Sequence, residues 1–323
     1  MDCGDKSKGK SAIELAIELG QRELPAKTLK VNGLHEGREF WIKYADLLDQ
    51  AWAEFPHLHP ALFTYNESFK EKFIEPQLRA AVKALREAAK VCNEDVDETP
   101  VKNLLTESKD VKGVYELNNG VFTDEFRTLL LEELEHVEQS GIPMRRPNSM
   151  NRYGCILAQI GMKAVFDQFC RDFISPIMEM IYPEYIARGD TCDNYPFTVD
   201  YRKDPSKDFD VDLKRHRDSS LATLNVCLGY KFTDGNLKFW GDNQTHCCPN
   251  CQSYDDSKGD GEIKMTPGLS ILHKGGHMHA ALPITSGHRV NLILWMYGEG
   301  GYVRNGKYPP SLQTTALDRW SER

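Results

Sequence analysis

Residues 216–229 read HRDSSLATLNVCLG, and residues 279–297 read HAALPITSGHRVNLILWMY. Each stretch begins at a histidine and continues into a run in which every second side chain is apolar. Side chains two positions apart on a strand point to the same side, so each run predicts a β-strand with one apolar and one more polar face. The more polar faces carry Thr223, Asn225 and Cys227 in the first run, and Arg289, Asn291, Ile293, Trp295 and Tyr297 in the second. Polar faces on strands this apolar indicate that both strands line a pocket.

Three residues near these strand ends form a candidate metal site: His216, Asp218 and His279. Two imidazoles and one carboxylate are the ligand set of non-haem Fe(II) sites that keep open coordination positions. His216 and Asp218 lie two positions apart, so both can reach one ion, whereas His279 has to come from a neighbouring strand. An H-x-D triplet alone occurs often by chance, but the distant histidine, followed ten residues later by an arginine, makes chance a poor explanation.

Arg289 is a candidate anion-binding residue. An arginine on an inner strand face is costly unless it meets an anion, and its planar guanidinium suits a carboxylate in bidentate geometry. A salt bridge at the rim of the pocket is the alternative. Tyr201 ends the predicted strand FTVDY (residues 197–201) and can direct its hydroxyl into the same cavity. A core tyrosine that is bonded elsewhere is the alternative for this residue.

Other histidines and cysteines could also bind a metal. His277 is the chief alternative to His279 as a ligand, although we interpret His273, His277 and His288 as exposed loop residues rather than as supports of the site. The cluster HCCPNC contains His246, Cys247, Cys248 and Cys251. These four zinc-type ligands are crowded together without a second CxxC pair, so loop thiols are favoured over a structural zinc site.

Helical patterns dominate the first part of the chain, and strands dominate from Phe197 onwards. The predicted helices cover residues 11–20, 40–55, 66–92 with a kink or break at Pro76, 123–139, and 163–181 with an interruption at Pro176. Helices first and many short strands afterwards are typical of an α+β fold. We expect a helical N-terminal region, residues 1–112, and a second region, residues 113–323, with the acidic and polar residues 93–112 as a linker.

The bulk composition limits the possible partners and the cellular location. The 323 residues carry a formal net charge of −8, which gives no overall basic surface for nucleic acid. No run of about 18 apolar residues predicts a membrane span, and the first twenty residues do not read as a secretory signal. The nine cysteines are odd in number and irregularly spaced, as in reduced intracellular proteins. We therefore expect an intracellular protein, cytoplasmic or nuclear.

Several of these segments together resemble a known family. The segments HRD, TLNVCLGYKFTDGNLKF and HAALPITSGHRVNLILW resemble the prolyl-4-hydroxylase type of Fe(II)/2-oxoglutarate-dependent dioxygenases. With RPNSMNRYGCILAQIGM and FISPIMEMIYPE, the sequence is most similar to the PKHD-type hydroxylases, the group that includes 2-oxoglutarate and iron-dependent oxygenase domain-containing protein 2. The resemblance covers about residues 113–300.

The resemblance implies a double-stranded β-helix, or jelly-roll, core over about residues 195–300, with flanking helices and a helical N-terminal extension. It implies His216, Asp218 and His279 as the catalytic iron ligands, because Pro283, Gly287 and Arg289 follow His279 as they do in the family. It assigns Arg289 to the distal carboxylate of 2-oxoglutarate and Tyr201 and Asn225 to further cosubstrate contacts. Asn151 and Tyr153 are expected at the pocket mouth.

The implied cofactors and cosubstrates are Fe(II), 2-oxoglutarate and O₂, with L-ascorbate as a further candidate. The implied reaction hydroxylates a C–H bond while 2-oxoglutarate is decarboxylated to succinate and CO₂. The expected substrate is a prolyl or lysyl side chain of a protein or peptide; a small-molecule metabolite and a non-catalytic binding module are the alternatives. The segment DPSKDFDVDL (residues 204–213) makes the run between Tyr201 and His216 longer than in many prolyl hydroxylases.

Overall fold

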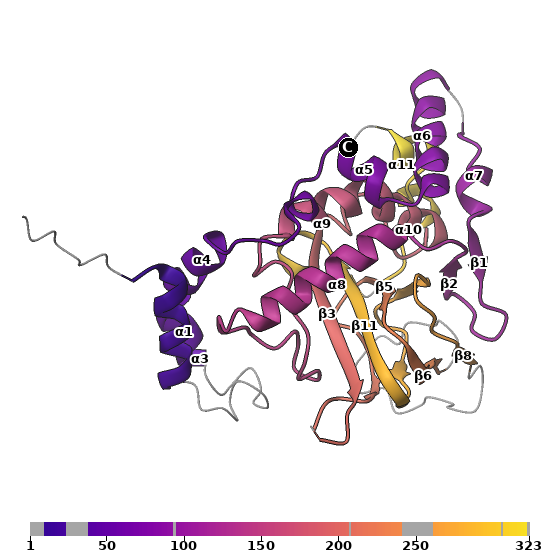
Figure 1. The fold of residues 1–323 in the computed structure, drawn as a ribbon. Helices are drawn as coiled ribbons and strands as arrows, with labels where there is room; N and C mark the ends of the chain where they lie inside the picture. Colours follow the sequence, from indigo (N-terminus) through magenta and orange to yellow (C-terminus); the bar gives the residue numbers. More distant parts are fainter. Residues whose placement is uncertain are drawn as a thin grey trace, which may run out of the picture.

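Helices dominate the chain up to residue 181 and strands dominate residues 193–297, as the sequence predicts. The computed structural model describes residues 10–23, 38–92, 95–206, 208–240, 261–304 and 306–321. Figure 1 shows the helices gathered on one side of the sheets, with α1, α3 and α4 at one end of the molecule. No helix of this described part is long and apolar enough to cross a membrane.

The helical part combines long helices, such as α6 and α8 with 16 residues each, with helices of only a few residues. Its elements up to residue 181 are α1 (Ala12–Glu23), α3 (Arg38–Lys43), α4 (Ala45–Ala53), η1 (Pro60–Phe63), α5 (Glu67–Phe73), α6 (Pro76–Val91), α7 (Thr99–Lys102), α8 (Asp124–Gln139), α9 (Lys163–Phe169), the π-helical η2 (Cys170–Ile174) and α10 (Ser175–Ile181). The C-terminal ones are η3 (Glu299–Gly301), η4 (Pro310–Leu312) and α11 (Ala316–Trp320).

Capping residues and prolines set the helix boundaries. Asn66 accepts a hydrogen bond from the Phe69 amide at 2.9 Å and so begins α5. Thr123 caps α8 in the same way. The break predicted at Pro76 within the helical residues 66–92 is confirmed, because α5 ends before this proline and Pro76 begins a second helix, α6. Proline lacks an amide hydrogen and is tolerated in the first helical turn, where that hydrogen would have no partner.

The strands form two antiparallel sheets. They are β1 (Leu105–Glu107), β2 (Tyr115–Leu117), β3 (Asp193–Lys203), β4 (Leu213–His216), β5 (Ala222–Gly229), β6 (Phe232–Asp234), β7 (Leu237–Phe239), β8 (Gly261–Ile263), β9 (Ser270–Lys274), β10 (His279–Ala281) and β11 (Ile284–Tyr297). The large sheet has the order β1-β2-β9-β5-β11-β3, with β6 also paired to β11, and the small sheet has the order β4-β10-β7-β8. Together with the flanking helices they give the predicted α+β architecture with a double-stranded β-helix core.

The segment that we expected to be a linker contains regular structure. Within residues 93–112, α7 follows directly after Glu98, and β1 pairs with β2 at the edge of the large sheet. At the other end of the chain, Arg319 and Trp320 of α11 both donate hydrogen bonds to the buried Glu98 carboxylate, at 2.9 and 2.8 Å. This contact ties the C-terminal helix to the start of α7.

The two faces of the large sheet have different partners. The apolar face of β5 and β11, which includes Leu224, Val226, Leu292 and Leu294, packs with α8, α9 and α10 in the main core. In Figure 1, α8 runs across this face of the sheet. The opposite face is turned toward the small sheet and lines a cavity with residues of β4, β7 and β10. The alternation that the sequence predicts for both strands is therefore confirmed, since each strand separates a helix-covered face from a cavity-lining one.

Candidate active site

A candidate metal centre lies where β4 and β10 pair in the small sheet. The register places His279 directly opposite His216, and Asp218 follows two residues after the end of β4. One ligand atom from each of these three residues lies within 4.8 Å of the other two. The Asp218 Oδ1 atom is 3.4 Å from His216 Nε2 and 3.7 Å from His279 Nε2. The strand pairing thus supplies the third ligand that the H-x-D triplet lacks.

Backbone carbonyls orient both imidazoles toward this centre. The Nδ1 atom of His216 lies 2.8 Å from the Lys214 carbonyl, and the Nδ1 atom of His279 lies 2.9 Å from the His277 carbonyl. A carbonyl can only accept, so each Nδ1 carries the proton and each Nε2 presents a lone pair. This is the arrangement in which histidine binds a metal, with the second ring nitrogen held by a hydrogen bond.

Asp218 is held as an ionised acceptor. Its side chain is 4% exposed, and Thr223 of β5 donates a hydrogen bond to Oδ2 at 2.6 Å, which leaves Oδ1 toward the histidines. Burial alone would raise the pKa of Asp218, but the adjacent His279 and His216 together hold it well below its usual range. Burial lowers the pKa of His279, which favours the neutral form that binds a metal. The donor set therefore fits a divalent ion such as Fe(II).

The structure corrects the interpretation of the neighbouring histidines. His273 is fully buried in β9, with Nε2 3.8 Å from Asp218 Oδ2, and burial lowers its pKa to about 3. His277 is also buried, and its ring packs against Phe239 while its carbonyl holds His279. Neither is an exposed loop residue, and His279, not His277, joins the candidate metal group among the described residues.

Arg289 lies in the same cavity on β11. It is 1% exposed, and its guanidinium stands 4.5 Å from the centre of the Tyr201 ring, opposite it on β3. One nitrogen donates to the Gly235 carbonyl, whereas Nε has no hydrogen-bond partner among the described residues. No carboxylate of that part of the chain forms an ion pair with Arg289, so a rim salt bridge is excluded there. A buried guanidinium without a counter-ion is costly, which points to a bound anion.

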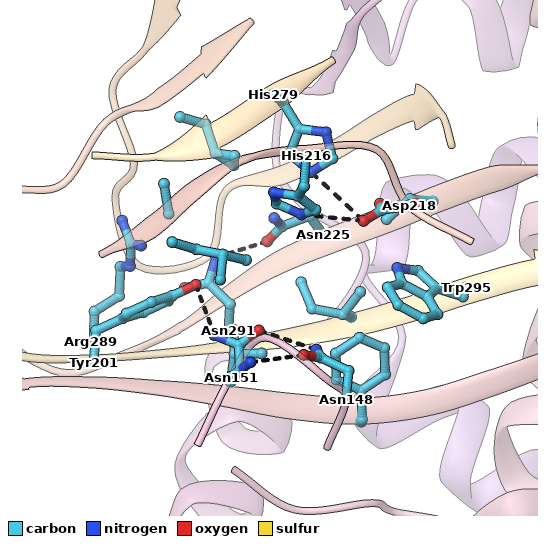
Figure 2. Close-up of a pocket in the computed structure, with 17 residues that line it drawn as sticks. Asn148, Asn151, Tyr201, His216, Asp218, Asn225, His279, Arg289, Asn291 and Trp295 are labelled. Atoms are coloured by element: carbon cyan, nitrogen blue, oxygen red, sulfur yellow. Dashed lines mark hydrogen bonds and ion pairs between the residues drawn. The ribbon is translucent and has the colours of Figure 1, made fainter. Parts of the chain in front are cut away.

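The cavity joins the metal centre to Arg289. Its walls and its open mouth border about 440 Å³ of space free of atoms, open solvent included. Its walls include Asn225, Asn291, Tyr201, Phe197 and Trp295 from the large sheet (Figure 2). Asn291 donates to Asn225 at 2.6 Å, and the buried Oδ1 of Asn291 has no partner of its own among the described residues. The cavity therefore combines a cationic end, a metal end and polar groups between them.

The sequence predicts only part of this cavity wall. Asn151 lines the cavity as expected, but Tyr153 lies outside it, with its hydroxyl donating to the Asp208 carbonyl at 2.9 Å. Asn148, which also lines the cavity, was not foreseen. No strand pattern marks these positions, because they lie in a turn-rich segment that only tertiary packing brings to β3. The HCCPNC cluster, including His246, Cys247, Cys248 and Cys251, falls outside the described residues.

The contact between Thr223 and Asp218 predicts an effect on metal affinity. We expect Thr223→Val to weaken divalent-metal binding about 10- to 100-fold, because the ligand carboxylate loses the hydrogen bond that orients it. Titration of the variant with Mn(II), followed by calorimetry, measures the change. Thr233→Val, which alters an exposed hydroxyl on β6, is the matched control and should bind metal normally. Wild-type affinity in Thr223→Val would show that this hydroxyl does not position Asp218.

A jelly roll with two histidines and an aspartate at one end of a cavity, and a buried arginine within the same cavity, defines the class of Fe(II)- and 2-oxoglutarate-dependent oxygenases. The family model of the OGFOD2-like domain matches residues 52–187. The 2-oxoglutarate and iron-dependent oxygenase domain-containing protein 2 of Xenopus tropicalis is 34% identical over 274 residues, which cover 84% of this chain and 67% of that protein. The chain belongs to this OGFOD2-like family of 2-oxoglutarate and iron-dependent oxygenases.

More distant proteins are also similar. Procollagen-lysine,2-oxoglutarate 5-dioxygenase 1 of Homo sapiens is 26% identical over 248 residues, which cover 72% of this chain and 28% of that protein. A solved prolyl hydroxylase from Trichoplax adhaerens, in complex with a hypoxia inducible factor peptide fragment, is 14% identical with a TM-score of 0.42, covering 70% of this chain and 94% of that one. The chain spans 48% to 67% of the length of the first four oxygenase relatives.

Proposed function

We propose that this chain hydroxylates a C–H bond of a prolyl or lysyl side chain in a protein or peptide. In the balanced reaction, substrate, 2-oxoglutarate and O₂ give hydroxylated substrate, succinate and CO₂. One observation carries the proposal above the others: the candidate metal ligands share one cavity with an arginine that has no carboxylate partner among the described residues. A metal at one end and a guanidinium at the other suit a dicarboxylate that must be held at both ends.

In this proposal His216, Asp218 and His279 hold Fe(II) through two Nε2 atoms and one carboxylate oxygen. Fe(II) bound there would supply the open positions at which O₂ and the 2-oxo acid group react. The carbonyls of Lys214 and His277 keep both imidazoles in the metal-binding tautomer. Phe197, Ile293 and Trp295 line the cavity with apolar surface, which limits the access of water to the reacting groups.

Arg289 binds the distal carboxylate of 2-oxoglutarate in this proposal. Two observations support this role: Nε has no hydrogen-bond partner in the described part of the chain, and the guanidinium lies over the aromatic face of Tyr201. Burial raises the pKa of Tyr201, so the phenol keeps its proton and can donate it to the same carboxylate. Asn225 and Asn291 lie between Arg289 and the metal ligands on the cavity wall and offer polar contacts along the cosubstrate.

The choice of a prolyl or lysyl substrate is supported by the name of a related protein. The relative from Homo sapiens that is similar across 72% of this chain is named for its action on procollagen lysine. In this proposal 2-oxoglutarate would occupy the cavity between Arg289 and the metal ligands, so the target residue would approach through the mouth, which suits a side chain presented by a peptide.

Succinate formation tests the function directly. The full chain, supplied with Fe(II), L-ascorbate as a reductant, 2-oxoglutarate and O₂, should produce succinate, and the rate should rise when the correct peptide is added. Proline- and lysine-containing peptide libraries, examined by mass spectrometry for a gain of one oxygen, identify the substrate class. Stimulation by a metabolite panel but by none of the peptides would contradict the peptide assignment. Absence of metal binding and of succinate in every condition would contradict the enzyme function.

A further inference from the structure

A short segment before β3 reaches into the cavity beside Tyr201. Asn148 and Asn151 belong to residues 146–155, which run along the free edge of β3. Tyr153 and Cys155 hydrogen-bond to β3 through their backbone carbonyls, at 3.2 and 2.8 Å. A Cβ atom at Gly154 would come within 2.0 Å of the Thr198 carbonyl oxygen. Only glycine at position 154 therefore lets the segment lie this close to the strand.

The lengthened run between Tyr201 and His216 fastens this segment. Arg152 donates from its backbone amide to Asp210 at 2.7 Å and from Nε to the same carboxylate at 2.6 Å. Its guanidinium also pairs with Asp208 at 2.7 Å. Both aspartates belong to the sequence DPSKDFDVDL, and the backbone amide of Arg202 in β3 donates a hydrogen bond to the Asp210 carbonyl at 2.9 Å. The additional loop residues therefore hold the asparagine segment against the sheet.

A chain of hydrogen bonds with one fixed direction runs through the two asparagines. The Asn148 Oδ1 atom accepts from the backbone amides of Met150 and Asn151, at 2.8 and 2.7 Å. Because amides can only donate, this fixes the orientation of the Asn148 side chain and turns its Nδ2 toward Asn151. Asn148 Nδ2 donates to Asn151 Oδ1 at 3.0 Å, and Asn151 Nδ2 donates to the Tyr201 hydroxyl oxygen at 3.3 Å (Figure 2).

The direction of this chain decides what the Tyr201 hydroxyl can do. Its oxygen accepts from Asn151, so its own proton has to be donated elsewhere. Within the described part of the chain no group accepts that proton, and the hydroxyl lies at the cavity with the guanidinium of Arg289 over its ring. Asn151 is fully buried and can scarcely be satisfied by solvent instead. Because the Tyr201 hydroxyl cannot donate to Asn151, its proton is available for a hydrogen bond to an anion in the cavity.

We propose that Asn148 and Asn151 are positioning residues that fix the polarity of the Tyr201 hydroxyl, so that it donates to the carboxylate bound by Arg289. The inference rests on the proposed function, since that carboxylate is the distal one of 2-oxoglutarate. Asn151 sets the direction of the phenolic proton, and Asn148 sets the direction of Asn151. Neither asparagine has to touch the cosubstrate for this effect.

Direct binding measures the effect without turnover. Titration of the full chain with 2-oxoglutarate, in the presence of Mn(II) in place of Fe(II), gives the dissociation constant by calorimetry. We expect Asn151→Ala to raise this constant about tenfold and Tyr201→Phe to raise it about 10- to 100-fold, the range for a hydrogen bond to a charged group. In the Tyr201→Phe background, Asn151→Ala should have no further effect, because the hydroxyl on which it acts is gone.

Two further variants separate polarity from loop structure. Asn148→Asp keeps the acceptor for the Met150 and Asn151 amides but loses the Nδ2 donor, so the Asn151 amide should reverse and weaken 2-oxoglutarate binding. This loss should again disappear in the Tyr201→Phe background, whereas simple charge repulsion would persist there. Tyr153→Phe removes a hydrogen bond that holds the same segment but is not part of the hydrogen-bond chain from Asn148 to Tyr201. This variant should bind 2-oxoglutarate normally.

The outcomes distinguish this inference from the proposed function. If the wild-type chain with Mn(II) binds no 2-oxoglutarate, the proposed function fails and the inference fails with it. If the wild-type chain binds and Asn151→Ala binds equally well, the inference alone is overturned. Equal effects of Asn151→Ala with and without the Tyr201 hydroxyl, or an equal loss in Tyr153→Phe, would also overturn it, because either result indicates only a loosened segment.

Discussion

Replacement of Asp218 with alanine is expected to reduce succinate formation more than about 100-fold, beyond the range that is usual for residues that only support a ligand. The variant loses the one anionic group of the candidate metal site, so His216 and His279 alone have to hold a divalent ion. We expect Fe(II) or Mn(II) affinity to fall in parallel with activity. Calorimetric metal titration and succinate quantification measure the two losses separately.

Asp212→Ala is the control for this variant. Asp212 lies six residues earlier, is exposed to solvent and does not line the cavity. Its removal changes the net charge by the same amount, so it should leave metal affinity and succinate formation unchanged. Undiminished turnover in Asp218→Ala would show that the carboxylate is not a ligand, and metal binding by another set of residues would then have to be sought.

Replacement of Arg289 with alanine is expected to raise the KM for 2-oxoglutarate by roughly 100-fold or more. Breaking one partner of a buried charge pair costs about 3–5 kcal/mol, and each 1.4 kcal/mol corresponds to about tenfold in affinity. The same substitution should lower the folding stability of the cosubstrate-free protein far less, because Arg289 forms no ion pair with a carboxylate of the described residues. Steady-state kinetics and thermal unfolding of the same variant provide the comparison.

Arg289→Lys separates charge from geometry. Lysine keeps the positive charge but lacks the planar fork that binds a carboxylate through two hydrogen bonds, so its KM should lie between those of wild type and Arg289→Ala. Arg304→Ala, outside the cavity, serves as the control. Normal 2-oxoglutarate affinity in Arg289→Ala would show that the cosubstrate carboxylate binds elsewhere. A large decrease of Tm in Arg289→Ala would show that the higher KM results from impaired folding instead.

The strand that carries Arg289 shows how much of the site local pattern can predict. Alternation along β5 and β11 correctly separates the helix-covered face from the face at the cavity, because the two-residue period of a strand is a property of the backbone itself. The capping residues Asn66 and Thr123 are predictable for a similar reason, since each acts on amides within three positions. Such interactions are encoded within a few neighbouring residues.

Burial of His273 and the place of Asn151 could not be read from the same patterns. A histidine in a sequence is usually taken to be polar and exposed. His273 is buried next to Asp218 because β9 pairs with β5 inside the sheet. Asn151 lies in a turn-rich segment whose contact with Tyr201 spans 50 positions. Contacts of that separation depend on how loops pack against the edge of a finished sheet.

Local sequence patterns predict which residues share a strand face and which are candidates for metal and anion binding, and they carry the resemblance to a family of oxygenases. Only the fold shows that β10 pairs with β4 and brings His279 to His216, that Arg289 has no carboxylate partner among the described residues, and that Asn148 and Asn151 are linked by hydrogen bonds to Tyr201. The reason is physical. Periodicity and capping are local properties of the chain, whereas ligand geometry and burial arise only when distant segments exclude water from a common space.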